Sequence, residues 1–155
     1  PPPPPLRILD LCAGSGAIGV AIAKAVPEAR VTLAEIDRAH LPTIQKNIES
    51  NVSQGSIRMD RFKVVGSDLF EKVEGEFDFI LTNPPYIDSA IDRTDESVKN
   101  HEPHLALYGG AHGMEIIDRI IATAPDYLIE GGQVWIEHEP EQVEAIRESA
   151  EACGF

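Results

Sequence analysis

The chain has 155 residues, of which 26 are acidic and 13 are basic, and its formal net charge is −13. The hydrophobic fraction of 43% is ordinary for one globular domain and excludes the disordered and fibrous classes. An acidic surface of this kind repels phosphate backbones, so we expect no direct, sequence-specific nucleic-acid partner.

Strands and helices alternate along the sequence. Five prolines at residues 1–5 favour an extended linker, and residues 6–155 are expected to form one domain. Apolar runs predict strands at 6–11, 30–35, 61–65, 77–82 and 133–138. Helical spacing predicts helices at 17–26, 40–52, 114–129 and 141–152, with the Gly131-Gly132 pair ending the third. This alternation predicts an α/β fold with a doubly wound, mainly parallel, Rossmann-like sheet.

A glycine-rich turn joins the first predicted strand to the first predicted helix. Gly14 and Gly16 allow a tight turn and a close approach of a ligand to the backbone. The second strand ends in Glu35, whose carboxylate can accept both hydroxyls of a ribose. The spacing also fits a dinucleotide fingerprint. Asp10 favours instead a cationic ligand without phosphate, such as S-adenosylmethionine, although a carboxylate there can also cap a helix or a turn.

The segment Asn83-Pro84-Pro85-Tyr86 follows the apolar fourth strand and is the most specific signal in the chain. The prolines fix the backbone and remove two N–H donors. The Pro84 carbonyl and the Asn83 side chain then offer two acceptors to a planar NH2 group, and Tyr86 offers a flat face. Because we expect the first and fourth strands to be neighbours, we predict that this segment faces the glycine turn. The alternative is a proline-rich strand exit without chemistry.

Several segments together resemble a known family. Residues 10–19 (DLCAGSGAIG), the strand ending in Glu35, residues 67–70 (SDLF) and the NPPY segment are similar to class I S-adenosylmethionine-dependent methyltransferases that act on amino groups. Residues 83–88 (NPPYID), 102–110 (EPHLALYGG) and Gly113-Met114 resemble, more narrowly, the release-factor glutamine N5-methyltransferases. The resemblance runs from about Leu6 to the end of the chain. It implies S-adenosylmethionine as cofactor, S-adenosylhomocysteine as product, and a peptide chain release factor of translation termination as protein substrate.

The resemblance also implies roles for individual residues. Asp10 would lie beside the methionine end of the cofactor, Glu35 would take the ribose hydroxyls, and Asn83 would hold the substrate glutamine amide with the Pro84 carbonyl. The implied cofactor-binding set is Asp10, Cys12, Ala13, Gly14, Ser15, Gly16, Glu35, Ile36, Asp68, Leu69 and Asn83. The implied catalytic set is Asn83, Pro84, Pro85 and Tyr86.

The sequence departs from the family in three places. His101 stands where the family usually has an aromatic residue. Family members carry a helical amino-terminal domain that helps to hold the protein substrate, and we expect it to be absent here. The chain also stops at Phe155, about where the last hairpin of the sheet would begin, so we expect that hairpin to be missing.

Other functions and other ligands fit the sequence less well than this resemblance. An adenine or other nucleic-acid amino-group methyltransferase conflicts with the net charge of −13. A nicotinamide-dependent oxidoreductase would leave NPPY without a role, and a non-catalytic binding module would bind the cofactor without turnover. The histidines fit no standard zinc spacing, so no metal is expected. No apolar run reaches the roughly 18 residues of a membrane span, and two cysteines form no disulfide framework, so we expect a cytoplasmic location.

Overall fold

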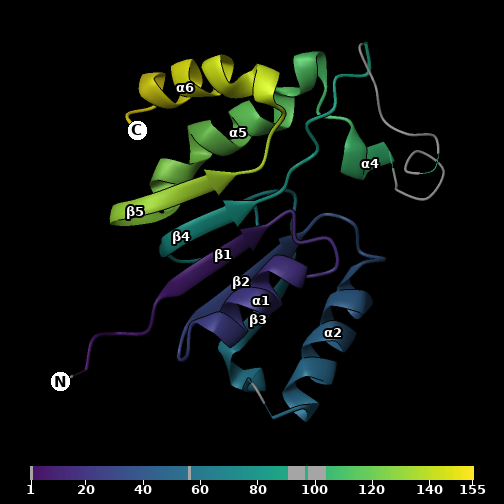
Figure 1. Ribbon diagram of the computed structural model, residues 1–155. Helices are drawn as coiled ribbons and strands as arrows, with labels where there is room; N and C mark the ends of the chain where they lie inside the picture. Colours follow the sequence, from purple (N-terminus) through teal and green to yellow (C-terminus); the bar gives the residue numbers. More distant parts are fainter. Residues whose placement is uncertain (1, 56, 91–96, 98–103) are drawn as a thin grey trace. The chain divides into compact units, whose positions relative to one another are not determined.

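The computed structural model describes residues 2–55, 57–90, 97 and 104–155, and strands and helices alternate along it (Figure 1). Contacts divide the chain into two compact units, Pro1–Thr82 with Asp126–Trp135 and Asn83–Pro125 with Ile136–Phe155. The strands are β1 (Arg7–Leu11), β2 (Arg30–Glu35), β3 (Phe62–Gly66), β4 (Phe77–Thr82) and β5 (Leu128–Ile136). The helices are α1 (Ala17–Ala25), α2 (Leu41–Ser53), α4 (His104–Leu107), α5 (Glu115–Thr123) and α6 (Val143–Ala152).

The first unit contains a five-stranded sheet with the order β3-β2-β1-β4-β5. The pairs β1–β2, β1–β4 and β2–β3 are parallel, and the arrow of β5 points the same way as that of β4 in Figure 1. Leu11 lies opposite both Ala34 and Thr82, so β1, β2 and β4 end at the same edge. The chain leaves β1 toward β2 on one side and reaches β4 on the other, which is the switch point where such sheets bind ligands.

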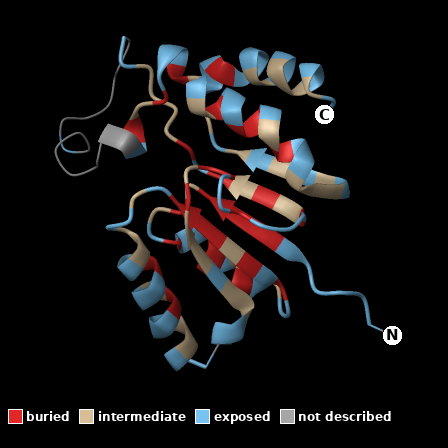
Figure 2. Cartoon of the chain, turned by 180° about the vertical axis from the view of Figure 1, so that it is seen from behind, coloured by how far each residue is buried: buried red, intermediate tan, exposed pale blue. Residues whose placement is uncertain are grey.

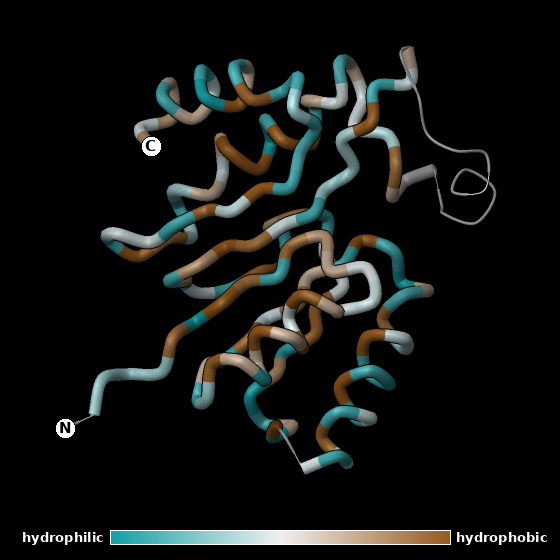
Figure 3. The backbone as a smooth tube through the Cα atoms, in the orientation of Figure 1, coloured by the Kyte–Doolittle hydropathy of each residue, from teal (hydrophilic) through white to brown (hydrophobic). Residues whose placement is uncertain are grey.

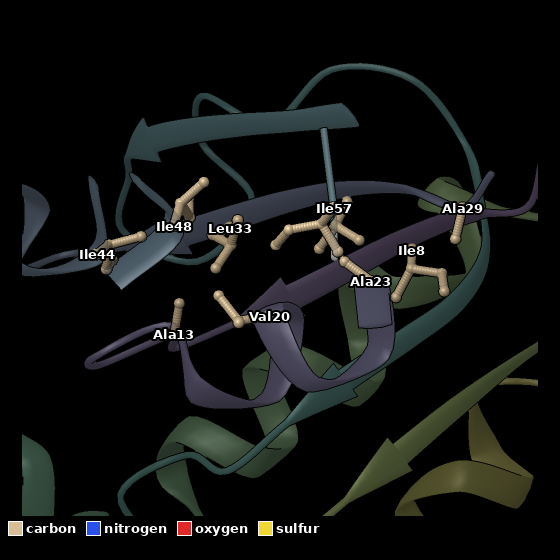
Figure 4. Packing of buried hydrophobic residues seen from close by; sticks show 10 residues of the cluster. Ile8, Ala13, Val20, Ala23, Ala29, Leu33, Ile44, Ile48 and Ile57 are labelled. Carbon is tan, nitrogen blue, oxygen red and sulfur yellow. The ribbon is translucent and has the colours of Figure 1, made fainter. Parts of the chain in front are cut away.

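Helices α1 and α2 pack on one face of β1, β2 and β3. Figure 4 shows Val20 of α1 and Ile44 and Ile48 of α2 near Leu33 of β2, and Ala23 of α1 belongs to the same cluster. The buried residues, red in Figure 2, lie both in the strands and in the helices. Helix α2 alternates between hydrophobic and hydrophilic residues in Figure 3, as expected for a helix with one face on a core.

Alternate residues of β1 serve the two faces of the sheet. Ile8 belongs to the cluster beneath α1 and α2, whereas Leu9 and Leu11, at the intervening positions, are fully buried without belonging to it. Asp10 has the same parity as Ile8 and therefore points toward α1. A carboxylate on the core side of a central strand is unusual and requires a hydrogen-bond donor.

The predicted elements agree with the structure within about two residues, except around the third predicted helix. The prediction of a helix over 114–129 is wrong at its end, because α5 stops at Thr123 and a 3-10 turn covers residues 124–127. Pro125 lies in that turn and has no N–H with which to continue the helical hydrogen bonds. Strand β5 then starts at Leu128, so Gly131-Gly132 lie within it rather than before it, and Gly131 has a φ of 77°.

The second unit contains α4, α5 and α6. Helices α5 and α6 pack side by side, and Ser149 donates to Asp118 across them at 2.8 Å. His101, Glu102 and Pro103, on which part of the resemblance depends, lie outside the described residues. In the part of the chain that is described, no helix has the length and apolar character needed to cross a membrane.

The core of the first unit can be tested at α2. Ile48 is fully buried, so Ile48→Ala should lower the free energy of unfolding by about 2–5 kcal/mol through lost burial and a residual cavity. Lys46→Ala, on the exposed side of the same helix, should change it by about 0.5 kcal/mol or less. Urea denaturation measures both, and equal effects would contradict the packing in Figure 4.

Candidate functional site

Three turns of the first unit leave the sheet at one edge. They follow β1 (residues 12–16), β2 (residues 36–40) and β3 (residues 67–72), and the registers Leu11–Ala34 and Glu35–Gly66 align the strand ends. Except for Asn83, every residue of the predicted cofactor-binding set lies at a strand end or in one of these turns. The structure therefore brings these residues to the same edge of the sheet.

Glu35 fixes the shape of the glycine turn. Its Oε2 accepts a hydrogen bond from the Gly14 N–H at 2.7 Å, and its Oε1 accepts one from the Asp37 N–H at 2.8 Å. The Ala13 N–H donates to the Ala34 carbonyl at 3.0 Å, so the turn is held along β2 at two points. Each carboxylate oxygen can accept more than one hydrogen bond, so Glu35 retains acceptor capacity for a ligand.

Glycine is needed at Gly14, Gly16 and Gly19 for different physical reasons. Gly14 has a φ of 55°, and a Cβ placed on it would meet nothing within 4 Å. A Cβ on Gly16 or on Gly19 would instead press on Leu33, at 3.0 Å and 2.8 Å. The close packing of α1 on β2 thus explains Gly16 and Gly19, and the open space of the turn lies at Gly14.

Asp10 is fully buried beneath the first turn of α1. Its Oδ2 accepts a hydrogen bond from the Gly19 N–H at 2.7 Å. Gly16, the N-cap residue of α1, has no side chain with which to cap the helix, so Asp10 takes that role. Its Oδ1 is also buried but accepts no hydrogen bond from any described residue. Burial, and then the negative charge of Glu35, raise the pKa of Asp10 to about 7. One oxygen therefore caps the helix, and the other is left for a donor or a cation.

Cys12 is held in the left-handed region, with a φ of 60°, at the start of the glycine turn. Burial raises the pKa of its thiol to about 12. The thiol is therefore protonated at neutral pH, which does not suit a nucleophile.

The turn after β3 depends on Ser67, which belongs to the SDLF segment but to which the sequence assigned no role. Its hydroxyl donates to the Leu69 carbonyl at 2.8 Å and accepts from the Lys72 N–H at 2.9 Å. The Ser67 N–H donates to the Glu35 carbonyl at 2.9 Å. These bonds shape the turn that carries Asp68 and hold Leu69 with a φ of 45°. A serine directly after a strand is a known turn signal, but a weak one.

Between β2 and α2, Ile36 is 50% exposed and follows Glu35 directly. An exposed isoleucine beside a buried carboxylate leaves an apolar surface next to the polar end of β2. Such a surface suits the flat face of a base.

The NPPY segment belongs to the second unit. Pro84 is fully buried and Asn83 is exposed. The Tyr86 hydroxyl donates to Glu137 Oε1 at 2.9 Å, and burial followed by that hydrogen bond raises the pKa of Tyr86 to about 12. The Ile87 N–H donates to the Leu107 carbonyl at 2.9 Å, which ties the end of the segment to residues 107–109.

The Gly109-Gly110 and Gly113 part of the resemblance has a structural explanation. A Cβ on Gly109 would lie 2.5 Å from the Pro85 carbonyl oxygen, and a Cβ on Gly113 would collide with the Tyr86 carbonyl oxygen. The Gly109 N–H also donates to the Ile87 carbonyl at 3.0 Å. These glycines therefore allow residues 109–113 to lie directly against the backbone of the NPPY segment.

Metal-binding side chains do not gather in the described part of the chain. No group of three or more histidine, cysteine, aspartate and glutamate side chains there could hold an ion. His112 Nδ1 lies 3.5 Å from Asp88 Oδ2, which forms a pair rather than a metal site.

The chain belongs to the methyltransferase small domain family, which it matches over residues 3–102. The ribosomal protein uL3 glutamine methyltransferase of Francisella tularensis is 37% identical over 131 residues, covering 84% of this chain and 40% of that protein. The release factor glutamine methyltransferase of Rhodopirellula baltica is 40% identical over 140 residues, covering 88% of this chain and 46% of that protein. The chain spans between 40% and 50% of the length of the curated relatives that it matches.

Solved structures show the same fold. A methyltransferase from Pyrococcus furiosus superposes with a TM-score of 0.69 at 23% identity, covering 97% of this chain and 64% of that chain. This likeness and the strand order confirm the predicted doubly wound α/β fold of the methyltransferase type.

The close approach at Gly113 gives a direct test. Gly113→Ala should destabilise the protein by about 1–3 kcal/mol more than Gly131→Ala, because its methyl group collides with the Tyr86 carbonyl. Gly131 also has a positive φ, 77° against 69° for Gly113, but a Cβ there meets nothing within 4 Å. The control thus reports the backbone strain alone. Chemical denaturation measures both, and similar losses would contradict the contact.

Proposed function

We propose that residues 6–155 form the catalytic domain of a methyltransferase that transfers a methyl group from S-adenosylmethionine to the side-chain amide nitrogen of a glutamine in a protein. One observation carries the proposal. The Asn83–Tyr86 segment is supported by residues 109–113 in a chain that is 37–40% identical to two proteins named as glutamine methyltransferases.

The first unit offers groups that fit the cofactor. Asp10 has a buried, unpaired oxygen, Glu35 has spare acceptor capacity, and the turn is open at Gly14. S-adenosylmethionine carries an ammonium and a sulfonium but no phosphate, and when bound it supplies an electrophilic methyl group. Asp10 suits the cationic methionine end of this cofactor, and Glu35 suits its ribose hydroxyls. Ile36 and the turn that carries Asp68 and Leu69 suit its adenine.

The NPPY segment suits the substrate amide. An amide nitrogen is a weak nucleophile because its lone pair is delocalised into the carbonyl. If Asn83 Oδ1 and the Pro84 carbonyl each accept one of its N–H groups, electron density moves onto the nitrogen and its direction is fixed. The new N–C bond forms as the S–C bond breaks, and the amide proton leaves to water afterwards, so no strong base is needed. Asn83 is joined by one peptide bond to Thr82, which pairs with Leu11.

We propose a peptide chain release factor as the protein substrate. The relative from Rhodopirellula baltica is named a release factor glutamine methyltransferase, and it is 40% identical to this chain. The relative from Francisella tularensis is named for ribosomal protein uL3 and has 37% identity. Both relatives are named as glutamine methyltransferases, so the two names share the acceptor residue and differ in the protein that carries it. Mass spectrometry of each protein after incubation with labelled S-adenosylmethionine distinguishes the two substrates.

The unpaired oxygen of Asp10 predicts how cofactor binding depends on pH. A cationic ligand favours the ionised carboxylate, so the Kd for S-adenosylmethionine should be constant above about pH 7 and should rise as Asp10 is protonated at lower pH. Loss of a charge-assisted hydrogen bond of about 1.5–3 kcal/mol corresponds to roughly ten- to a hundredfold weaker binding. Asp10→Asn should bind weakly at every pH, and Asp60→Asn, an exposed control, should follow the wild type. Calorimetry between pH 5.5 and 8.5 measures the three. A wild-type Kd that does not change with pH would contradict the role of Asp10.

Asn83 tests the substrate half of the proposal. Asn83→Ala should lower kcat for glutamine methylation by about a hundredfold or more, because the amide loses one of its two orienting acceptors. Its affinity for S-adenosylmethionine should fall far less than kcat does, because Asp10 and Glu35 remain in place. Asn51→Ala, which removes an amide from α2, serves as the matched control. Full turnover by the Asn83 variant would refute the assignment.

A further inference from the structure

Gln142 is a buried polar side chain that lies outside every predicted site. Its Nε2 donates to the Tyr86 carbonyl at 2.9 Å and to the His112 carbonyl at 3.2 Å. Its Oε1 accepts from the Glu139 N–H at 2.9 Å. Two carbonyls on one side and an N–H on the other fix the orientation of the amide. Gln142 thus joins the NPPY segment, the loop before α5 and the start of α6.

Tyr86 is held at both of its ends. Gln142 binds its backbone carbonyl, and Glu137 Oε1 accepts from its hydroxyl at 2.9 Å. The pKa of Tyr86 is raised to about 12, so the phenol remains a donor to Glu137 throughout the neutral range. The backbone and the ring are therefore fixed by two different side chains from the stretch that follows β5.

The carbonyl groups of the NPPY segment have little room to move. Gly109 lies against the Pro85 carbonyl and Gly113 lies against the Tyr86 carbonyl, and a Cβ on Gly113 would also come within 2.5 Å of Gln142 Nε2. The ring of Pro85 fixes its φ, which removes one of the rotations between the Pro84 carbonyl and the Tyr86 carbonyl. Fixing the Tyr86 carbonyl therefore also restrains the direction of the Pro84 carbonyl.

We propose that Gln142, supported by Glu137, is a positioning residue that holds the backbone of the NPPY segment so that the Pro84 carbonyl and Asn83 accept the substrate amide in one orientation. The kinetic part of this inference rests on the proposed function. Neither side chain touches the reacting atoms in this account, and each acts through Tyr86.

The first experiment replaces Gln142 by a near-isosteric acid. Gln142→Glu removes both donors and places a carboxylate beside two carbonyl oxygens, whereas Gln54→Glu makes the same charge change at an exposed position. Gln142→Glu should lower kcat for methylation of a release factor at least tenfold and leave the Kd for S-adenosylmethionine within twofold. Hydrogen exchange should become at least tenfold faster at the Ile87 and Gly109 amides, which donate within this network, and should not change at Val20 in α1.

A second pair of variants, at Glu137, tests the inference even if the Gln142 variant does not fold. Glu137 is exposed, so Glu137→Ala should fold normally but lower kcat, whereas Glu137→Gln keeps an acceptor for the Tyr86 hydroxyl and should restore most of kcat. An unchanged kcat in both Gln142→Glu and Glu137→Ala would overturn the inference. Equally fast exchange at Val20 and Ile87 in Gln142→Glu would overturn it too, because it would show a general loss of stability.

The two proposals can fail separately. If the wild-type protein methylates neither the release factor nor uL3, the proposed function is wrong. The exchange of the Ile87 and Gly109 amides then still decides whether Gln142 holds the segment. Turnover in the wild type with unchanged exchange in Gln142→Glu would overturn the positioning role alone.

Discussion

The turn between β1 and α1 keeps its shape because one N–H group of the turn and one N–H group of the first turn of α1 donate to buried carboxylates. The Gly14 N–H donates to Glu35 and the Gly19 N–H donates to Asp10. Each carboxylate comes from the end of a central strand, so the sheet itself sets where the turn lies. Burying two acids near each other is costly unless donors compensate, and burial, together with the charge of Glu35, raises the pKa of Asp10. Helix packing and the proposed cofactor site thus depend on the same pair of side chains.

The second unit uses the opposite arrangement. There the groups to be held are carbonyls, since the prolines of the NPPY segment supply acceptors and no donors. The Gln142 amide donates to the Tyr86 carbonyl, the Ile87 N–H donates to the Leu107 carbonyl, and Gly109 and Gly113 allow close approach to the segment. A rigid set of acceptors is what an amide NH2 group requires. Packing against the backbone of the NPPY segment therefore explains Gly109 and Gly113.

Reasoning from the sequence succeeded where a residue type has one dominant physical use. The apolar runs located the strands, and the glycines after β1 and Glu35 at the end of β2 lie at one edge of the sheet. It failed near α5 because the stripe of isoleucines continues toward Pro125, and the proline, which ends the helix, was given too little weight. The roles of Ser67 and Gln142 were not predicted because a serine after a strand and a glutamine before a helix are common in any protein. Their importance comes from partners distant in the chain, such as Glu35 and Tyr86.

The sequence by itself determined the order of strands and helices, the family resemblance and the residue types that a methyl-transfer site requires. Those features depend on local spacing and on the intrinsic chemistry of side chains, which are written in the order of the residues. Only the tertiary structure decided that one oxygen of Asp10 caps α1 while the other stays unpaired, and that Gln142 holds Tyr86. Hydrogen bonds of this kind join residues 9 to 56 positions apart, and their partners are set by packing rather than by sequence distance.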